Sequence, residues 1–181
     1  MLPDLLAPDL RVVFVGTSVA RASAVGRHYY SSWNNSFWEL LRKAGLTEGA
    51  LLAPQQDRLL LGYGIGLTDL VKSRVASSDS LLHRSDYDVP GFLEKIHRYT
   101  PRVLAFNGKT AAREVFGALD FGAPRLGLAE AGIGKARVYT LPSSSGSSAD
   151  PRHHAPKVSK VAWWIEFGEW LRGTESAESS A

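Results

Sequence analysis

The stretch RVVFVGTSVARASAVGRHYYSSWNNSFWELLRKAG, from Arg11 to Gly45, decides the fold of this chain. Its apolar run from Val12 to Val15 predicts a buried strand. A turn of small residues follows, then a loop with two adjacent tyrosines, and then a helix opened by Asn35. Proteins that alternate strands and helices bind ligands at the carboxyl ends of their strands. The stretch therefore predicts a ligand pocket beside its turn.

The composition of the 181-residue chain excludes several classes of protein. It contains no cysteine, which excludes disulfides, thiol nucleophiles, cysteine-ligated iron–sulfur clusters and the common structural zinc sites. No apolar run approaches the length of a membrane span, and the acidic N-terminus does not resemble a signal peptide, so we expect a cytoplasmic protein. The net charge of +3 is compatible with a polyanionic partner but too small to require one.

The rest of the chain alternates helices and strands. Two more strands are predicted at 103–106 and 136–142, and the helices are predicted at 54–61, 90–99, 107–119 and 158–171. We therefore expect an α/β fold of three layers, in which helices flank a short, mostly parallel central sheet. Residues 1–172 are expected to form a single domain, and the small polar residues 173–181 a disordered tail.

The loops that follow the strands are expected to meet at one edge of the sheet. The first loop begins with Gly16, Thr17 and Ser18, whose small size lets a ligand approach backbone amides, and the Ser18 hydroxyl can position a water. An ordinary tight turn is the commoner meaning of these three residues alone. Tyr30 is predicted to stack on a flat heterocycle, whereas Tyr29 is predicted to pack in the core.

The third loop, SSSGSSAD at 143–150, combines flexible backbone with hydroxyl donors. Such a loop can hold phosphates, and Arg152, Lys157 and Lys160 lie near enough in the sequence to add positive charge. A run of serines is more often a surface linker. The adjacent histidines at 153–154 point in different directions and make a poor metal pair, so we expect no metal site.

Three aspartates are candidates for chemistry on a sugar. Asp88 is well placed to cap the helix that Pro90 begins, which leaves Asp86 to orient a water or to stabilise an oxocarbenium-like sugar. Asp69, in the segment GLTDLVK, is a third candidate. A structural hydrogen bond to a neighbouring loop explains Asp69 equally well.

Five elements between Leu6 and Gly146 occur in an order that resembles the mismatch-specific uracil-DNA glycosylase (Mug) family, relatives of the thymine-DNA glycosylases. They are LAPDLRVVFVG, the NxFW element with LLRKAGLT, GLTDLVK, FNGKTA and LPSSSG. The resemblance implies an enzyme that flips a damaged or mispaired base from duplex DNA and hydrolyses its N-glycosidic bond without a cofactor. We also expect a monomer in the bacterial cytosol, associated with the nucleoid, with single-stranded DNA as a second candidate substrate.

The chain departs from the family at two motifs. The family's first motif reads Gly-Ile-Asn-Pro-Gly, and its asparagine holds the hydrolytic water; here Ser18 takes that place. The second motif, Asn-Pro-Ser-Gly-Leu-Ser-Arg, falls on 143–149, where Ser147 replaces the leucine that wedges into DNA and Ala149 replaces the arginine. The implied base-binding residues are Gly16, Thr17, Tyr30 and Asn35, and the implied DNA-binding residues are Ser143, Ser145, Gly146, Ser147, Ser148 and Arg152.

A branch that resembles this chain begins its first motif with Gly-Thr, and SDYDVP resembles the place where such a branch carries a catalytic aspartate. We therefore predict that Asp86 orients the water and that Ser18 is a polar helper, because a serine hydroxyl stays protonated near neutral pH. G:U mispairs are expected to be preferred, since flipping costs least where pairing is weak. The alternatives are a protein that binds damaged DNA without catalysis and an α/β protein that binds a small nucleoside.

Overall fold

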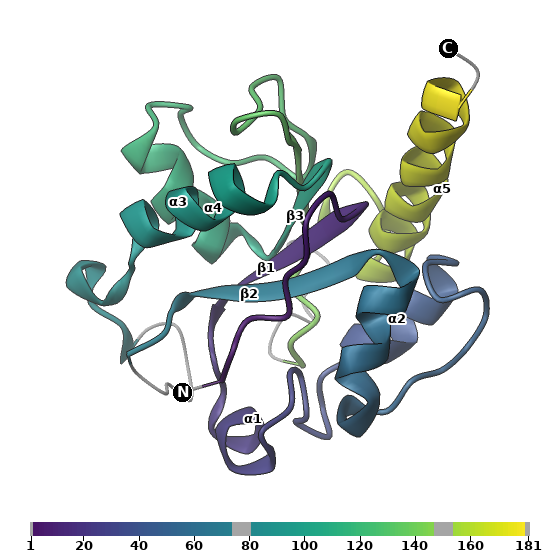
Figure 1. Cartoon of the computed structure of the whole chain (residues 1–181), viewed down its shortest axis with the longest axis horizontal. Coiled ribbons are helices and arrows are strands. Elements are labelled where there is room, and N and C mark those ends of the chain that lie inside the picture. The colour runs from purple at the N-terminus through teal and green to yellow at the C-terminus, as the bar shows by residue number, and fades with distance from the viewer. Residues whose placement is uncertain (1, 74–80, 147–153, 180–181) are drawn as a thin grey trace.

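A mixed, mostly parallel sheet forms the centre of the molecule in the computed structural model, and helices pack on both of its faces (Figure 1). The structure describes residues 2–73, 81–146 and 154–179. Within these ranges the strands follow the order β2-β1-β3-β5-β4, with β4 antiparallel to β5 and the other pairs parallel. Their bounds are β1 (Val12–Ser18), β2 (Ile65–Val71), β3 (Val103–Asn107), β4 (Gly127–Leu128) and β5 (Arg137–Leu141). The predicted three-layer α/β fold is confirmed.

The helices fall close to where the sequence predicts them. The described helices are α1 (Arg21–Gly26), α2 (Phe37–Lys43), α3 (Val89–Tyr99), α4 (Lys109–Ala118) and α5 (Lys160–Ser179), with the 3-10 helices η1 (Pro54–Tyr63) and η3 (Arg84–Asp86). Among these, α1 and η3 have no counterpart in the sequence prediction. No helix in the described ranges is long and apolar enough to span a membrane.

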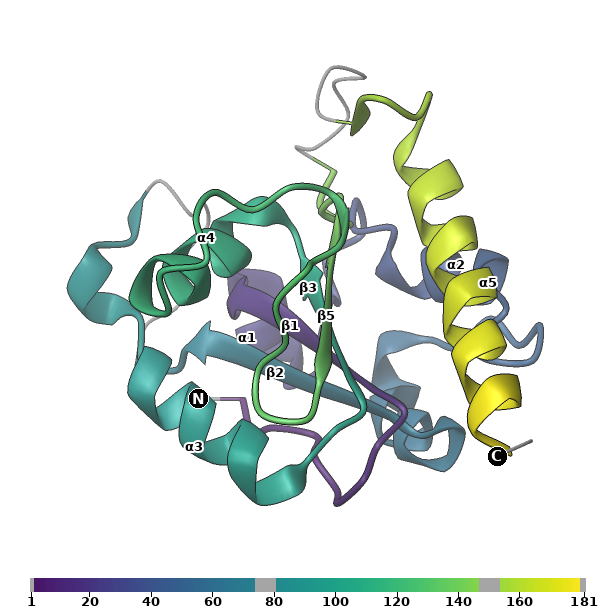
Figure 2. The same ribbon diagram turned by 90° about the horizontal axis from the view of Figure 1, so that it is seen from above.

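The two faces of the sheet carry separate hydrophobic clusters, because successive side chains of a strand point to opposite sides. Helices α2 and α5 cover one face, and α3 and α4 cover the other (Figures 1 and 2). Along β1, for example, Phe14 packs on the α2–α5 face, while Val13 and Val15 pack on the α3–α4 face. Burial of the parallel strands on both sides explains their nearly continuous apolar sequences.

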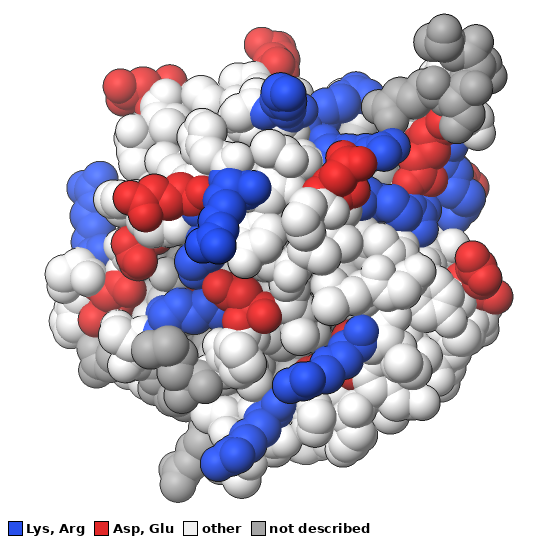
Figure 3. All heavy atoms as spheres, viewed as in Figure 1, with Lys and Arg blue, Asp and Glu red and all other residues white. Residues whose placement is uncertain are grey.

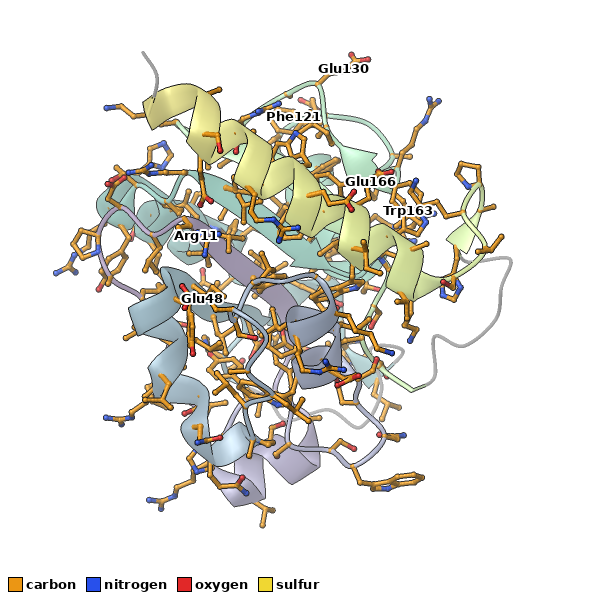
Figure 4. All side chains as sticks on the ribbon, turned by 90° about the vertical axis from the view of Figure 1, so that its right-hand side faces the viewer. Arg11, Glu48, Phe121, Glu130, Trp163 and Glu166 are labelled. Atoms are coloured by element: carbon orange, nitrogen blue, oxygen red, sulfur yellow. The ribbon has the colours of Figure 1, made fainter. Side chains whose placement is uncertain are left out.

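Helix α5 continues through residues 173–179, which the sequence predicts to be a disordered tail. Tertiary contacts explain the extra turns: Arg11, beside the C-terminal half of α5 (Figure 4), forms an ion pair with Glu175. Arg172 donates to the carbonyl of Ala44 over 2.8 Å, so the end of α5 is also tied to the end of α2. The composition of the segment is too polar to predict an ordered helix, and these long-range partners are invisible in the local sequence.

Close packing of α5 on α2 depends on Gly168. A Cβ atom at this position would lie 1.9 Å from the carbonyl oxygen of Ala44, so only glycine permits the observed approach of the two helices. This contact fixes the middle of α5 against the end of α2. The four parallel strands β1, β2, β3 and β5 all end at one edge, which is where the predicted pocket residues gather.

Candidate functional site at the carboxyl edge of the sheet

Gly16 lies at the centre of the site. It pairs with Asp69 across β1 and β2, and the Asp69 side chain is buried. A Cβ built on Gly16 would lie 2.2 Å from Oδ1 of Asp69 and 3.2 Å from the hydroxyl of Tyr30. Both polar groups therefore lie over the α-carbon of Gly16, and a larger residue there would displace them.

Tyr30 is held in an unusual conformation beside this glycine. Its φ angle is +51°, in the left-handed region that non-glycine residues rarely adopt. Its ring stacks on Phe37, with ring centroids 3.9 Å apart and planes 24° apart. The hydroxyl is buried and has no hydrogen-bond partner with good geometry in the described structure. Backbone strain and an unsatisfied buried hydroxyl are both enriched at binding sites, so they support a functional role for Tyr30.

The electrostatics of the Tyr30 hydroxyl follow from its surroundings. Burial has the largest effect and raises the pKa of Tyr30, and the negative charge of Asp69 raises it further. The side chain of Asn107 acts in the opposite direction and lowers the pKa in part. The hydroxyl therefore stays protonated at neutral pH, as a neutral group that can donate a hydrogen bond.

Tyr29 packs in the core, as the sequence predicts, with 2% of its surface exposed. Its hydroxyl accepts a hydrogen bond from Nζ of Lys72 over 3.0 Å, and its backbone N–H donates to Asp57. The pKa of Tyr29 is raised, by burial first and then by Asp69. Tyr29 thus fixes the loop that carries Tyr30.

Asn107 and Ser144 join the ends of β3 and β5. The Asn107 amide donates to Oγ of Ser144, and the Ser144 backbone N–H donates back to Oδ1 of Asn107, each over 2.8 Å. Both residues are buried. The sequence pattern predicts Asn107 only as the start of a helix, and it does not predict this contact. The available signal is a polar residue directly after an apolar strand, the same signal that marks Gly16 to Ser18.

Lys160, at the start of α5, holds the beginning of the serine-rich loop. Its Nζ donates to the carbonyls of Ser143 and Ser145 over 3.0 and 2.9 Å. Burial lowers the pKa of Lys160. Of the predicted DNA-binding residues, Ser143, Ser145 and Gly146 therefore belong to a tethered segment, and Ser147, Ser148 and Arg152 lie outside the described residues.

A second loop, residues 31–36, packs against this serine-rich segment. Ser36 directs both its backbone N–H and its hydroxyl to the carbonyl of Ser144, each over 3.0 Å. Gly146 lies against Asn34, since a Cβ on the glycine would be 2.8 Å from the Asn34 carbonyl oxygen. Asn35 is a predicted base-binding residue, and its Oδ1 accepts the N–H of Phe37 at the start of α2.

Gly16, Thr17 and Ser18, which the sequence predicts to begin a loop, still belong to β1, and Asp86 lies in η3. Ser18 ends β1 opposite Val71, and Thr17 is largely buried beside it. Oδ2 of Asp86 accepts the backbone N–H of His83 over 2.8 Å, and this contact caps η3. Two residues later the backbone N–H of Asp88 donates to the carbonyl of Leu70, so the segment that carries Asp86 is anchored to the end of β2.

The Asp88 side chain caps α3, as the sequence predicts, by accepting the N–H of Gly91 over 2.9 Å.

On the face shown in Figure 3, acidic and basic side chains are interspersed rather than gathered into one basic patch. In the described parts of the chain, no three acidic or histidine side chains are placed to hold a metal ion together. The arrangement thus places a protonated hydroxyl and a buried carboxylate side by side over Gly16, at the carboxyl edge of the sheet.

Comparison with known proteins identifies the fold family. A solution NMR structure of a Methanosarcina acetivorans protein, described as a candidate uracil DNA glycosylase, is similar to this chain with a TM-score of 0.63. The two are 23% identical, and the similarity covers 94% of this chain and 96% of that one. At this identity the likeness establishes the fold. The sequence model of the uracil DNA glycosylase superfamily matches residues 3–167, nearly the whole described chain, and the protein therefore belongs to that superfamily of DNA glycosylases.

Proposed function

We propose that the protein is a monofunctional DNA glycosylase of the Mug-like branch, which removes uracil from DNA and prefers G:U mispairs. The observation that carries the proposal is the placement of the Tyr30 hydroxyl and the Asp69 carboxylate over Gly16, at the carboxyl edge of the sheet. The collinear resemblance to the Mug family supports the branch. Superfamily membership supports the reaction class.

In the proposed complex the flipped base stacks on Tyr30, on the side away from Phe37. Backbone N–H groups at the carboxyl end of β1, from Gly16 to Ser18, donate to its carbonyl oxygens. As the bond to the sugar lengthens, negative charge develops on the base, and preorganised donors stabilise that charge more in the transition state than in the ground state. An ionised Asp69 accepts hydrogen bonds only, so it is suited to an N–H on the edge of the base.

The water that attacks the sugar is assigned to Asp86, with Ser18 as a polar helper. Oδ2 of the Asp86 carboxylate accepts the His83 N–H, and a carboxylate can accept several hydrogen bonds at once. Capping η3 and orienting a water are therefore compatible. Asp69 is the competing candidate, because its carboxylate lies directly over Gly16, beside the Tyr30 hydroxyl.

Contacts to DNA are assigned to the serine-rich loop. Ser143, Ser145, Gly146, Ser147, Ser148 and Arg152 would hold phosphates through hydroxyls, backbone amides and one guanidinium. Flipping a base costs a few kcal/mol and costs least at a mismatch, which favours uracil opposite guanine. Phosphate contacts release counterions, so binding should weaken as the salt concentration rises.

The test is excision from oligonucleotides that carry one uracil opposite guanine, opposite adenine, or in a single strand. We expect alkali-labile sites, formed fastest at the G:U pair, and a single-turnover rate that falls by about 100-fold or more in Asp86→Asn. Asp88→Asn is the matched control, because that carboxylate caps α3. If Asp69→Asn abolishes excision while Asp86→Asn does not, Asp69 and not Asp86 orients the attacking water.

A second function is favoured by one residue, Ser18, which stands where the family places its water-holding asparagine. A protein that binds damaged DNA without catalysis would keep the pocket and lose the reaction. Tight binding to the G:U duplex with no excision by the wild-type protein would establish this function and overturn the enzyme.

A further inference from the structure

Trp33 is an exposed tryptophan that the fold does not explain. Its side chain is 96% exposed, a larger fraction than that of any other large hydrophobic residue in the described ranges. Tryptophan is usually buried over most of its surface, because leaving its large ring in water is costly. An indole displayed in this way on the surface is characteristic of a binding contact.

A short hydrogen-bonded turn presents the Trp33 ring. The backbone N–H of Asn35 donates to the carbonyl of Ser32 over 2.9 Å, which closes a four-residue turn with Trp33 in its second position. The Ser32 hydroxyl donates to Oδ1 of Asn34 over 2.7 Å and braces the same turn. The ring is therefore carried by ordered backbone.

The turn lies between the two parts of the proposed DNA site. Trp33 is three residues from Tyr30, and the loop after it is tied to the serine-rich segment by the two bonds from Ser36 to the Ser144 carbonyl. Asn34, next to Trp33, packs against Gly146. The resemblance places the DNA wedge at the next residue, Ser147, where the leucine is replaced.

We propose that Trp33 stacks on the DNA bases next to the flipped nucleotide and holds open the gap that the flipped base leaves. A serine is too small to fill that gap, whereas an indole presents a flat apolar face of the size of a base. Large apolar side chains inserted between base steps are a common way to hold DNA in a distorted form. The proposal rests on the proposed function, and it adds the residue that replaces the missing wedge.

The experiment measures binding to a duplex that carries an abasic-site analogue opposite guanine, with 2-aminopurine as the neighbouring base. The wild-type protein is expected to bind and to raise the 2-aminopurine fluorescence. Trp33→Ala should weaken binding by about tenfold and lose most of the fluorescence change, whereas Trp33→Phe should retain most of both. Because stacking neutralises no phosphate, the salt dependence of binding should be the same for Trp33→Ala and the wild type.

Leu128→Ala is the control, since Leu128 is 45% exposed on the edge strand β4 and should not affect binding. Both variants should unfold close to the wild-type temperature, because Trp33 is almost fully exposed and Leu128 is half-exposed. Equal binding and fluorescence for Trp33→Ala and the wild type would overturn the role of Trp33 and leave the glycosylase proposal intact. If the wild-type protein binds no DNA, the proposed function itself fails.

Discussion

The two faces of the sheet are equally well buried, but they relate differently to the pocket. On the α2–α5 face, Phe14 stacks on Trp164 with planes 4° apart and meets Phe37 edge-on, and Phe37 in turn stacks on Tyr30. Ring contacts therefore run without a break from the middle of the core to the pocket. On the α3–α4 face, Phe106 contacts Phe92 and Phe116, and aliphatic side chains surround them.

This difference shows that burial alone does not identify the residues that support a site. A rigid ring behind Tyr30 preorganises a stacking surface, which lowers the entropy lost when a base binds. The α3–α4 face supplies stability of the same kind without touching Tyr30. Variants on the two faces should therefore separate stability from function.

The largest expected effect comes from Phe37→Ala, compared with Phe116→Ala on the opposite face. Both rings are buried, so each change should lower the free energy of unfolding by about 3–5 kcal/mol. Only Phe37→Ala removes the support of Tyr30, so excision per folded molecule should fall in this variant and persist in Phe116→Ala. Urea unfolding and single-turnover excision on the same samples provide the two measurements.

Because either alanine variant can fail to fold, Phe37→Leu serves as a milder change. It should cost about 1.5 kcal/mol or less, yet it still removes the ring on which Tyr30 stacks. Equal loss of excision in Phe116→Leu and Phe37→Leu would show that the ring pathway has no special role.

Gly16→Ala should have the next largest effect, and it tests the pocket edge directly. The new methyl group would lie 2.2 Å from the buried Asp69 carboxylate, so the carboxylate or the strand must shift, at a cost of about 1–3 kcal/mol. Excision should be lost even where the protein is folded. Gly117→Ala, in α4 with no atom within 4 Å of the added group, should instead stabilise the protein by about 0.5–1 kcal/mol. Full excision activity in Gly16→Ala would show that Asp69 and Tyr30 are not part of the functional site.

The sequence predicts the fold much better than it predicts the site. Periodic apolar runs locate β1, β3, β5, α3 and α4, because these elements bury whole faces and their patterns are local. The contacts of Asp69 with Gly16, and of Asn107 with Ser144, join residues far apart in the chain. They depend on strand order and register, which a single sequence does not specify.

The family motifs identify Gly16 and Tyr30 as candidate pocket residues, because each motif is a short stretch of sequence. They cannot show that Tyr30 adopts a left-handed backbone or that its hydroxyl is buried. The roles of Asp86 and Ser18 stay predictions, because the position of the attacking water depends on bound DNA.

Lys160→Met should have a smaller effect and separates the DNA loop from the pocket. The ammonium group holds two backbone carbonyls of the serine-rich segment, so its loss should loosen that segment and cost about 1 kcal/mol of stability. Binding to the G:U duplex should weaken by about three- to tenfold. The salt dependence should change little, because Lys160 acts on the loop backbone; a slope reduced by about one would show a direct phosphate contact. Lys43→Met, which removes an ion pair with Glu39 within α2, is the control.

The smallest effect is expected at Asp4, which joins the two faces. Its carboxylate accepts from Thr68 of β2, and it pairs with Lys72 beside Tyr29 and with Lys95 of α3. Burial alone would raise the pKa of Asp4, but the charge of Lys72 and the hydrogen bonds outweigh burial and lower it. A lowered pKa in the folded state means that the ionised carboxylate contributes stability above its unfolded pKa, and that this stability is lost as the pH falls through the folded pKa.

Asp4→Asn should therefore lower the free energy of unfolding by about 1 kcal/mol at pH 7, and the difference from the wild type should shrink towards zero as the pH is lowered below the usual carboxyl range. Urea unfolding at pH 7, 5 and 3 measures this trend. Asp9→Asn is the comparison, because Asp9 pairs with Arg102 at an exposed position where solvent screens the charges. If Asp4→Asn lowers the free energy of unfolding by the same amount at every pH, packing rather than charge holds the N-terminal segment across the sheet edge. The two faces would then be coupled only through the strands between them.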